Sequence, residues 1–267
     1  MSNVGFIGTG NMGGALARAA ARSNHTLLLA DGLQEKAEAL AAELGGTATT
    51  AEKIIASADA VFLGVKPQML PALADQLRPA LAARTAPLLI ISMAAGVTLE
   101  TLQGLLGAYN PIIRIMPNTP VGVGEGMIVW CASANTVAED KALFLDILAH
   151  AGTLDELSEH LIDAATAVMG CGPAFVDLFI EALADGGVKC GLPRDKALTY
   201  ATQMVLGSAK LVKDSGKHPA ELKDAVCSPG GSTIVGVSTL EEGGFRGLTM
   251  SAVEASFKRT QELNQSK

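Results

Sequence analysis

The sequence has few aromatic residues and few charged ones. Aromatic residues make up 4% of the 267-residue chain and charged residues 18%, against 49% for the hydrophobic class. The charge that is present is acidic, since 20 Lys and Arg stand against 27 Asp and Glu and leave a net charge of −7. Nucleic acids and anionic membranes attract basic surfaces, so neither is expected as a partner. The apolar content also excludes a disordered chain, and a surface with so little charge favours an oligomer.

Cysteine and histidine are too sparse and too scattered to predict a metal site. The four cysteines, at 131, 171, 190 and 227, form no C-x-x-C pair, and no H-E-x-x-H occurs. No apolar run reaches the roughly 18 residues that span a membrane. The opening Met1-Ser2-Asn3-Val4 has no basic segment of a signal peptide. We therefore expect reduced thiols and a cytoplasmic protein without a metal.

Short apolar runs alternate with helical patterns in the first part of the chain. Expected strands lie at Val4–Gly8, Thr26–Asp31, Ala60–Val65, Leu88–Ser92, Ile112–Met116, Met127–Ala132 and Thr153–Leu157. Expected helices lie at Asn11–Ser23, Gln34–Leu44, 68–83, 98–107 and 136–150. Such alternation predicts a parallel sheet covered by helices on both faces. The two prolines of Met116–Pro120 predict a rigid, non-helical segment.

The strand signal stops after Ser158. Helical patterns follow at Leu161–Val168, Ala174–Cys190, Arg194–Asp214, Pro219–Ala225, Thr233–Glu242 and Gly247–Leu263. We therefore predict an α/β protein with a sheet domain over residues 1–158 and an all-helical domain over residues 159–267.

A glycine motif lies between the first strand and the first helix. Gly8, Gly10 and Gly13 form G-x-G-x-x-G, in which the first glycine makes the turn, the second admits a pyrophosphate and the third lets helix and strand pack closely. The helix N-terminus would hold the phosphates. This context predicts a Rossmann-like dinucleotide site. Asp31, 18 residues after Gly13, fits the ribose hydroxyls of NAD(H) and would repel a 2′-phosphate, although capping of the next helix is an alternative role.

Two further strands end in segments that suit a nucleotide. Lys66 follows the expected strand Ala60–Val65, where it either faces the ligand crevice or is an ordinary surface lysine. Met93-Ala94-Ala95-Gly96 follows the next strand and leaves room for a flat nicotinamide. No serine nucleophile elbow and no G-K-[ST] phosphate loop are present. A nicotinamide-dependent redox enzyme is the interpretation that remains.

The helical half contains an unusual Cys227-Ser228-Pro229-Gly230-Gly231-Ser232-Thr233 segment. Two adjacent glycines are unfavourable inside a helix. The segment is interpreted as a turn that presents bare N–H groups and two hydroxyls at the start of a helix, which would bind a carboxylate. A plain connector between two helices is the alternative.

The chain resembles the pyrroline-5-carboxylate reductase family from end to end. The resemblance lies in Val4–Gly8, Val65-Lys66-Pro67, Ala94–Val97, Met116-Pro117-Asn118-Thr119-Pro120, Glu181–Gly191, His218-Pro219 with Leu222-Lys223-Asp224, and Ser228-Pro229-Gly230-Gly231 with Thr233-Ile234. It implies NAD(P)H-dependent reduction of Δ1-pyrroline-5-carboxylate to L-proline, the last step of proline biosynthesis. It also implies a homodimer that exchanges its helical domains, a decamer of five dimers in some members, and an active site shared between subunits.

The resemblance also assigns roles to residues. Those implied for the cofactor are Ile7, Gly8, Thr9, Gly10, Asn11, Met12, Val65, Lys66, Pro67, Met93, Ala94 and Ala95, joined by Asp31 from the motif. Those implied for the substrate are Glu159, Ser228, Gly230, Gly231, Ser232 and Thr233. The Thr233 hydroxyl is the expected catalytic donor to the imine nitrogen.

The sequence departs from the family pattern at several positions. The usual S-G-S-G-P-A-Y is Met169–Phe175 here, with a thiol at Cys171 and no phenol oxygen at Phe175. Ala51 and Ala225 replace a cofactor-contacting asparagine of some members, and Asp31 disagrees with a preference for NADPH. The alternatives are a β-hydroxyacid dehydrogenase, for which the expected lysine is absent near Gly170, and a dinucleotide sensor without catalysis.

Overall fold

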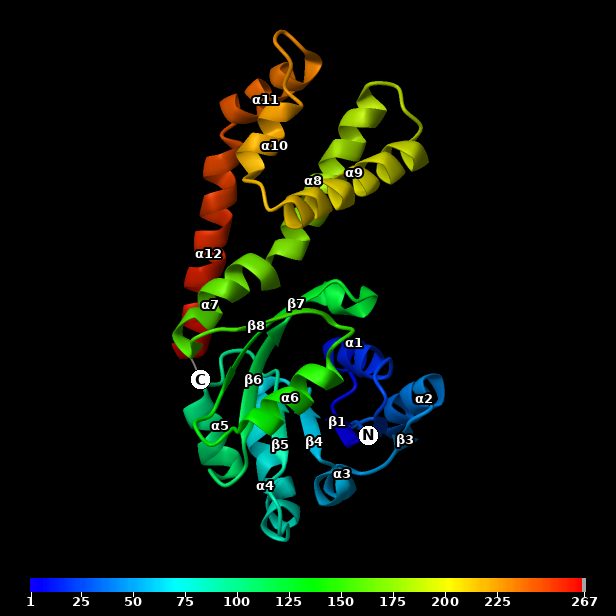
Figure 1. Ribbon diagram of the computed structural model, residues 1–267, viewed down its shortest axis with the longest axis vertical. Coiled ribbons are helices and arrows are strands. Elements are labelled where there is room, and N and C mark those ends of the chain that lie inside the picture. The colour runs from blue at the N-terminus through cyan, green and yellow to red at the C-terminus, as the bar shows by residue number, and fades with distance from the viewer. Residues whose placement is uncertain (266–267) are drawn as a thin grey trace. The chain divides into compact units, whose positions relative to one another are not determined.

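The computed structural model describes residues 1–265 and divides into two compact units (Figure 1). Unit 1 comprises Met1–Gly170 together with the chain from Phe257 onward, and unit 2 comprises Cys171–Ser256. Unit 1 therefore extends past residue 158. The segment after residue 158 packs on unit 1 through Ile162, which is fully buried in one apolar cluster with Val129 and Cys131.

Unit 1 is built on one eight-stranded sheet. Its strands are β1 (Asn3–Ile7), β2 (Thr26–Ala30), β3 (Thr47–Ala48), β4 (Ala60–Leu63), β5 (Leu89–Ser92), β6 (Ile112–Pro117), β7 (Gly126–Ala132) and β8 (Gly152–Glu156). The order β3-β2-β1-β4-β5-β6-β7-β8 confirms the Rossmann-like fold. Every neighbouring pair is parallel except β6 with β7, which is antiparallel. The connection over residues 118–125 is too short for a parallel crossover, which needs about a dozen residues.

Helices cover both faces of this sheet, because successive strand residues point to opposite sides. Phe6 packs in one cluster with residues of α1 (Asn11–Ala20), α2 (Gln34–Leu44) and α6 (Ala138–Ile147). Its neighbour Ile7 packs in a second cluster with residues of α3 (Ala51–Ser57), α4 (Leu70–Ala82) and α5 (Leu99–Leu106). The near-continuous apolar strands of the sequence are explained by burial on both sides.

Some local structure differs from the sequence prediction. β3 has two residues and α3 only seven, too few for a periodic pattern; Thr50 caps α3 by accepting a hydrogen bond from the Lys53 amide. The prediction that Met116–Pro120 is non-helical is wrong from Thr119 onward, where the 3₁₀ helix η2 (Thr119–Val123) begins. Pro120 stands in its first turn, where a missing N–H costs nothing.

The predicted helix Leu161–Val168 is three short pieces. They are the 3₁₀ helix η3 (Glu159–Leu161), the α-helix α7 (Ile162–Ala165) and the π-helical turn η4 (Thr166–Gly170). The Asn118 side-chain amide donates to the Met169 carbonyl oxygen at 3.0 Å and so holds the π-helical turn.

Unit 2 is all-helical and buries little on its own. Its helices are α8 (Gly172–Lys189), α9 (Arg194–Ser215), α10 (Pro219–Ala225), α11 (Ser232–Glu242) and the first part of α12 (Phe245–Gln265) (Figure 1). Its buried cluster consists of Ala184, Ala197 and Ala201. Leu178 and Leu248, in contrast, are 66% and 68% exposed, so this unit leaves apolar surface for another chain to cover. Taken together, the helical elements over Glu159–Lys189 pass the length and composition test for a membrane-crossing helix, a test that a helix of a soluble protein also passes.

Candidate active site

The turn between β1 and α1 requires glycine at two of its three motif positions. Gly8 has a φ of +97°, and a Cβ atom there would lie 2.7 Å from the backbone of Gly64. A Cβ atom on Gly13 would lie 2.1 Å from the Gly8 carbonyl oxygen. Real Cβ contacts are not that short, so any side chain would push β1, β4 and α1 apart.

Gly10 has a different environment. A Cβ atom there would meet nothing within 4 Å. Gly10 is also the N-cap of α1, and no side chain caps this helix end. The first amides of a helix have no partner within the helix, and together with the helix dipole they attract an anion. The turn therefore offers an open cradle for a pyrophosphate, and these residues fit a dinucleotide.

The other predicted cofactor segments lie at the same edge of the sheet. The Gly64 amide donates to the Ile7 carbonyl oxygen at 2.8 Å, and the Met93 amide to the Leu63 carbonyl oxygen at 3.4 Å. Because β1, β4 and β5 are parallel, Ile7–Met12, Val65–Pro67 and Met93–Ala95 all follow the carboxyl ends of these strands. A dinucleotide in an open α/β sheet binds at this edge. Lys66 is exposed there.

Asp31 is tied to the glycine-rich turn. Its Oδ2 atom accepts hydrogen bonds from the Thr9 amide at 2.7 Å and the Thr9 hydroxyl at 3.0 Å, and its Oδ1 atom accepts one from the Leu33 amide at 3.0 Å. Burial opposes ionisation, but these hydrogen bonds outweigh it, and the pKa of Asp31 is lowered. The carboxylate thus keeps its charge, with about one of its four lone-pair sites left for a ribose hydroxyl. Asp31 does not cap α2, because the N-cap of that helix is Leu33 and no side chain caps this helix end. The role of Asp31 at the ribose stays a prediction.

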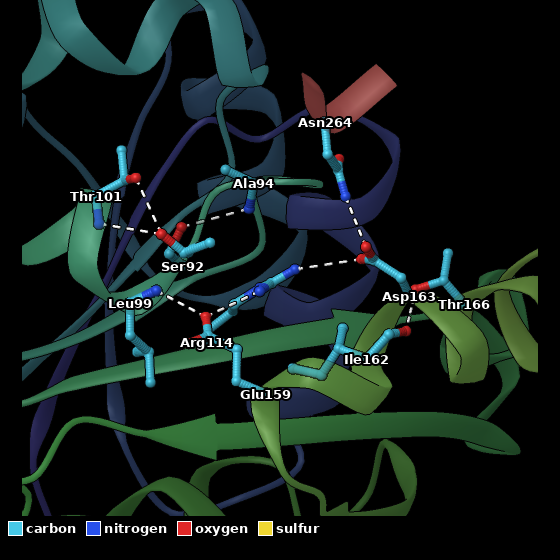
Figure 2. A network of polar contacts seen from close by, with 11 residues as sticks. Ser92, Ala94, Leu99, Thr101, Arg114, Glu159, Ile162, Asp163, Thr166 and Asn264 are labelled. Carbon is cyan, nitrogen blue, oxygen red and sulfur yellow. Dashed lines mark hydrogen bonds and ion pairs between the residues drawn. The ribbon is translucent and has the colours of Figure 1, made fainter. Parts of the chain in front are cut away.

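Glu159, expected at the substrate, belongs to a polar network in unit 1 (Figure 2). Its Oε1 atom accepts hydrogen bonds from the Leu99 amide at 2.7 Å and from Nη1 of Arg114 at 2.9 Å. Arg114 was not predicted as a site residue, although an arginine inside the otherwise apolar strand Ile112–Met116 could have indicated one. The two side chains help to line a cavity of about 1070 Å³ together with Pro67, Gln68, Gly96 and Thr98.

The segment Ser228–Thr233 lies in unit 2 and forms a tight turn before α11. The Gly231 amide donates to the Ser228 carbonyl oxygen at 3.0 Å, and Gly230 has a φ of +66°. Gly231 is the N-cap of α11, and no side chain caps this helix end either. Ser232 and Thr233 are exposed in its first turn. The turn thus presents amides and two hydroxyls at a helix entrance, as its sequence predicts, and its binding role stays a prediction.

Comparison with known proteins assigns the family. Residues 159–263 match the family model described as pyrroline-5-carboxylate reductase dimerisation, and residues 3–96 match the model described as NADP oxidoreductase coenzyme F420-dependent. The chain is 41% identical to pyrroline-5-carboxylate reductase 2 of Homo sapiens, over 98% of this chain and 83% of the relative. It is also 41% identical to pyrroline-5-carboxylate reductase of Glycine max, over 98% and 96%.

A solved structure agrees with these relatives. The crystal structure of Plasmodium falciparum pyrroline carboxylate reductase with NADP bound is similar to this chain with a TM-score of 0.86 and 34% identity, and the match covers 98% of both chains. On sequence and on fold, the chain belongs to the pyrroline-5-carboxylate reductase family.

Proposed function

We propose that this protein reduces the C=N bond of Δ1-pyrroline-5-carboxylate with NAD(P)H and releases L-proline, the last step of proline biosynthesis. The observation that carries the proposal is the open cradle at Gly10 in a chain that matches reductases of this substrate over nearly its full length. The helix-entrance turn at Ser228–Thr233 supplies the chemistry that a small carboxylate needs.

Each part of the chain has a separate task in this reaction. The amides after Gly10 bind the pyrophosphate, and Val65–Pro67 and Met93–Ala95 line the remainder of the dinucleotide. Asp31 faces the adenosine ribose and favours NADH over NADPH through its charge. The amides and hydroxyls of Ser228 and Gly230–Thr233 bind the substrate carboxylate and fix which ring face is reduced. Glu159 contributes at the substrate side.

NAD(P)H supplies the hydride, which adds to the imine carbon of the ring. The π electrons of the C=N bond move to the nitrogen, which takes one proton from solvent water and so becomes the amine of proline. The Thr233 hydroxyl donates a hydrogen bond to this nitrogen and polarises the double bond. A hydroxyl is a weak acid, so its contribution is position and polarisation rather than full proton transfer.

The protein is a homo-oligomer, in keeping with a helical half that matches a dimerisation model and leaves leucines exposed. We further propose that the helical domain, in the structure the helices of unit 2, exchanges between the subunits of a dimer, so that one subunit's Thr233 serves its mate's cofactor. Five dimers form a decamer in this proposal, and the protein is cytoplasmic and binds neither nucleic acid nor membrane. Native mass spectrometry tests the assembly; a monomer with full activity would overturn it.

A spectrophotometric assay tests the reaction. NADH or NADPH oxidation at 340 nm should require Δ1-pyrroline-5-carboxylate and should persist in EDTA, because no metal ligand cluster is expected from the sequence. A β-hydroxyacid dehydrogenase would instead oxidise hydroxyacids with NAD⁺ or NADP⁺. A dinucleotide sensor would bind the cofactor without oxidising it.

A further inference from the structure

We infer that Glu159 is a positioning residue for the cofactor, because it fixes the turn between β5 and α5, and that Arg114 holds Glu159 in place. This inference rests on the proposed function, since it takes Met93–Ala95 as a wall of the NAD(P)H site.

The turn after β5 is held at both of its ends. At its start, the buried Ser92 hydroxyl accepts a hydrogen bond from the Ala94 amide at 3.3 Å (Figure 2). The Val97 amide then closes the turn on the Ala94 carbonyl oxygen, with Gly96 at a φ of +71°. At its end, the Leu99 amide donates to Glu159.

The bond from Leu99 supplies something that α5 itself cannot. Leu99 is the first residue of α5, and the amide of a first helical residue has no partner within its helix. The hydroxyl of the N-cap residue Thr98 accepts a hydrogen bond from a different amide, that of Thr101, at 3.2 Å. The Glu159 carboxylate, from a segment 60 residues further along the chain, therefore fixes where α5 begins.

Arg114 determines where that carboxylate lies. The Arg114 side chain is only 5% exposed and extends from β6, a strand inside the sheet. A buried guanidinium needs a carboxylate partner, and the Glu159 Oε1 atom is the nearest at 2.9 Å. Asp163 is more distant, at 3.8 Å, and accepts instead a 2.8 Å hydrogen bond from the Asn264 side chain. The sheet thus fixes Arg114, Arg114 fixes Glu159, and Glu159 fixes the end of the turn.

The turn is a wall of the cavity rather than a remote support. Gly96, Val97 and Thr98 line the same cavity as Pro67, which follows β4 among the predicted cofactor residues. A turn without its anchor at Leu99 has more conformations to lose when the nicotinamide binds, so cofactor affinity and the alignment of the hydride should both suffer.

The first test compares two double variants that differ only at the acceptor. Arg114→Met with Glu159→Gln keeps an oxygen for the Leu99 amide, whereas Arg114→Met with Glu159→Leu does not. Both remove the ion pair between Arg114 and Glu159, and both leave Asp163 with its hydrogen bond from Asn264, so the comparison is matched at every other charge. The leucine version should bind NADPH about tenfold more weakly by fluorescence titration, the loss of one hydrogen bond to a buried amide. Its peptide over residues 93–105 should also exchange amide hydrogens faster without cofactor.

The second test removes the donor in case the first variants fail to fold. Leu99→Pro has no amide to donate, suits the first position of a helix, and follows a residue that is already extended, with a φ of −76° and a ψ of 160° at Thr98. Leu99→Ala is the control, because it loses at least as much side-chain packing as the proline variant and keeps the amide. The proline variant should show the weaker NADPH binding and the lower kcat.

Equal NADPH affinity and equal exchange within each pair would overturn the positioning role. Failure of the proposed function gives a different result, because the wild type would then bind NADPH but not oxidise it with Δ1-pyrroline-5-carboxylate.

Discussion

Alanine at Gly10 and alanine at Gly13 add the same methyl group to the same turn, and they should have opposite consequences. At Gly13 the new Cβ atom would lie 2.1 Å from the Gly8 carbonyl oxygen, a backbone atom that cannot rotate away. At Gly10 it would meet no protein atom within 4 Å and would project into the space expected to hold the pyrophosphate. The first change should damage the fold, and the second only the binding of cofactor.

The contacts give the expected size of each effect. Overpacking against backbone destabilises by about 3 kcal/mol, which lowers the melting temperature of a unit this large by roughly 6–12 °C. The Gly10 variant loses only part of a helix cap, less than about 1 kcal/mol. Keeping the pyrophosphate away from one or two amides costs about 1.5–3 kcal/mol, which weakens NAD(P)H binding roughly tenfold to a hundredfold.

Two measurements separate these outcomes. Differential scanning fluorimetry without cofactor should give a lower melting temperature for Gly13→Ala and nearly the wild-type value for Gly10→Ala. Fluorescence titration with NADPH should show the reduced affinity of Gly10→Ala. Gly104→Ala is the control, because Gly104 lies inside α5 with no atom near its would-be Cβ, and it should keep cofactor affinity. Wild-type NADPH affinity in Gly10→Ala would refute the claim that the pyrophosphate binds at this turn.

Substitutions at Thr233, Ser232 and Asp31 test the rest of the site, and a thiol measurement tests the buried Cys131. Thr233→Ala should lower kcat about tenfold to a hundredfold, some 1.4–2.7 kcal/mol of transition-state stabilisation, with little change in NAD(P)H affinity. Ser232→Ala should lower kcat less. A Thr233→Val enzyme as fast as wild type would show that the hydroxyl takes no part in the mechanism. Asp31→Ser should shift the NADPH-to-NADH specificity ratio towards NADPH by about 1–3 kcal/mol. An unchanged ratio would show that Asp31 does not face the ribose and only binds the Thr9 and Leu33 amides. Burial, reinforced by Glu159, raises the pKa of the Cys131 thiol from 9.0 to about 11. That thiol should resist alkylation at pH 8 in the folded protein, and its contribution to stability should be lost as the pH rises from 9 towards 11; rapid alkylation of native Cys131 at pH 8 would contradict this.

Local signals explain which elements could be predicted from the sequence. The helices Gln34–Leu44 and Pro219–Ala225 are found with the predicted bounds. The first ends at Gly45, which adopts a left-handed φ of 68°, and the second starts with proline in its first turn behind the cap at His218. A residue type placed at a helix end carries this information without any tertiary contact.

Long-range polar contacts could not be predicted in the same way. Arg114 and Glu159 lie 45 residues apart, and only the fold brings the carboxylate to both the arginine and the amide of Leu99. The structure shows Glu159 bound to Arg114 and to the Leu99 amide, contacts that the sequence did not predict, and its contact with substrate stays a prediction. The antiparallel direction of β7 could not be predicted either, because the sequence pattern of a buried apolar strand is the same in parallel and antiparallel pairs.

The transfer of hydride from the cofactor to the ring is the central claim, and an isotope experiment tests it most directly. The enzyme is incubated with Δ1-pyrroline-5-carboxylate and, in separate reactions, with the two forms of NADH that carry deuterium on one or the other face of nicotinamide C4. The product is then analysed by mass spectrometry. One of the two forms should yield L-proline heavier by one deuterium, carried at ring carbon 5, and the other should yield unlabelled proline. Unlabelled proline from both forms, or no proline at all, would contradict the account.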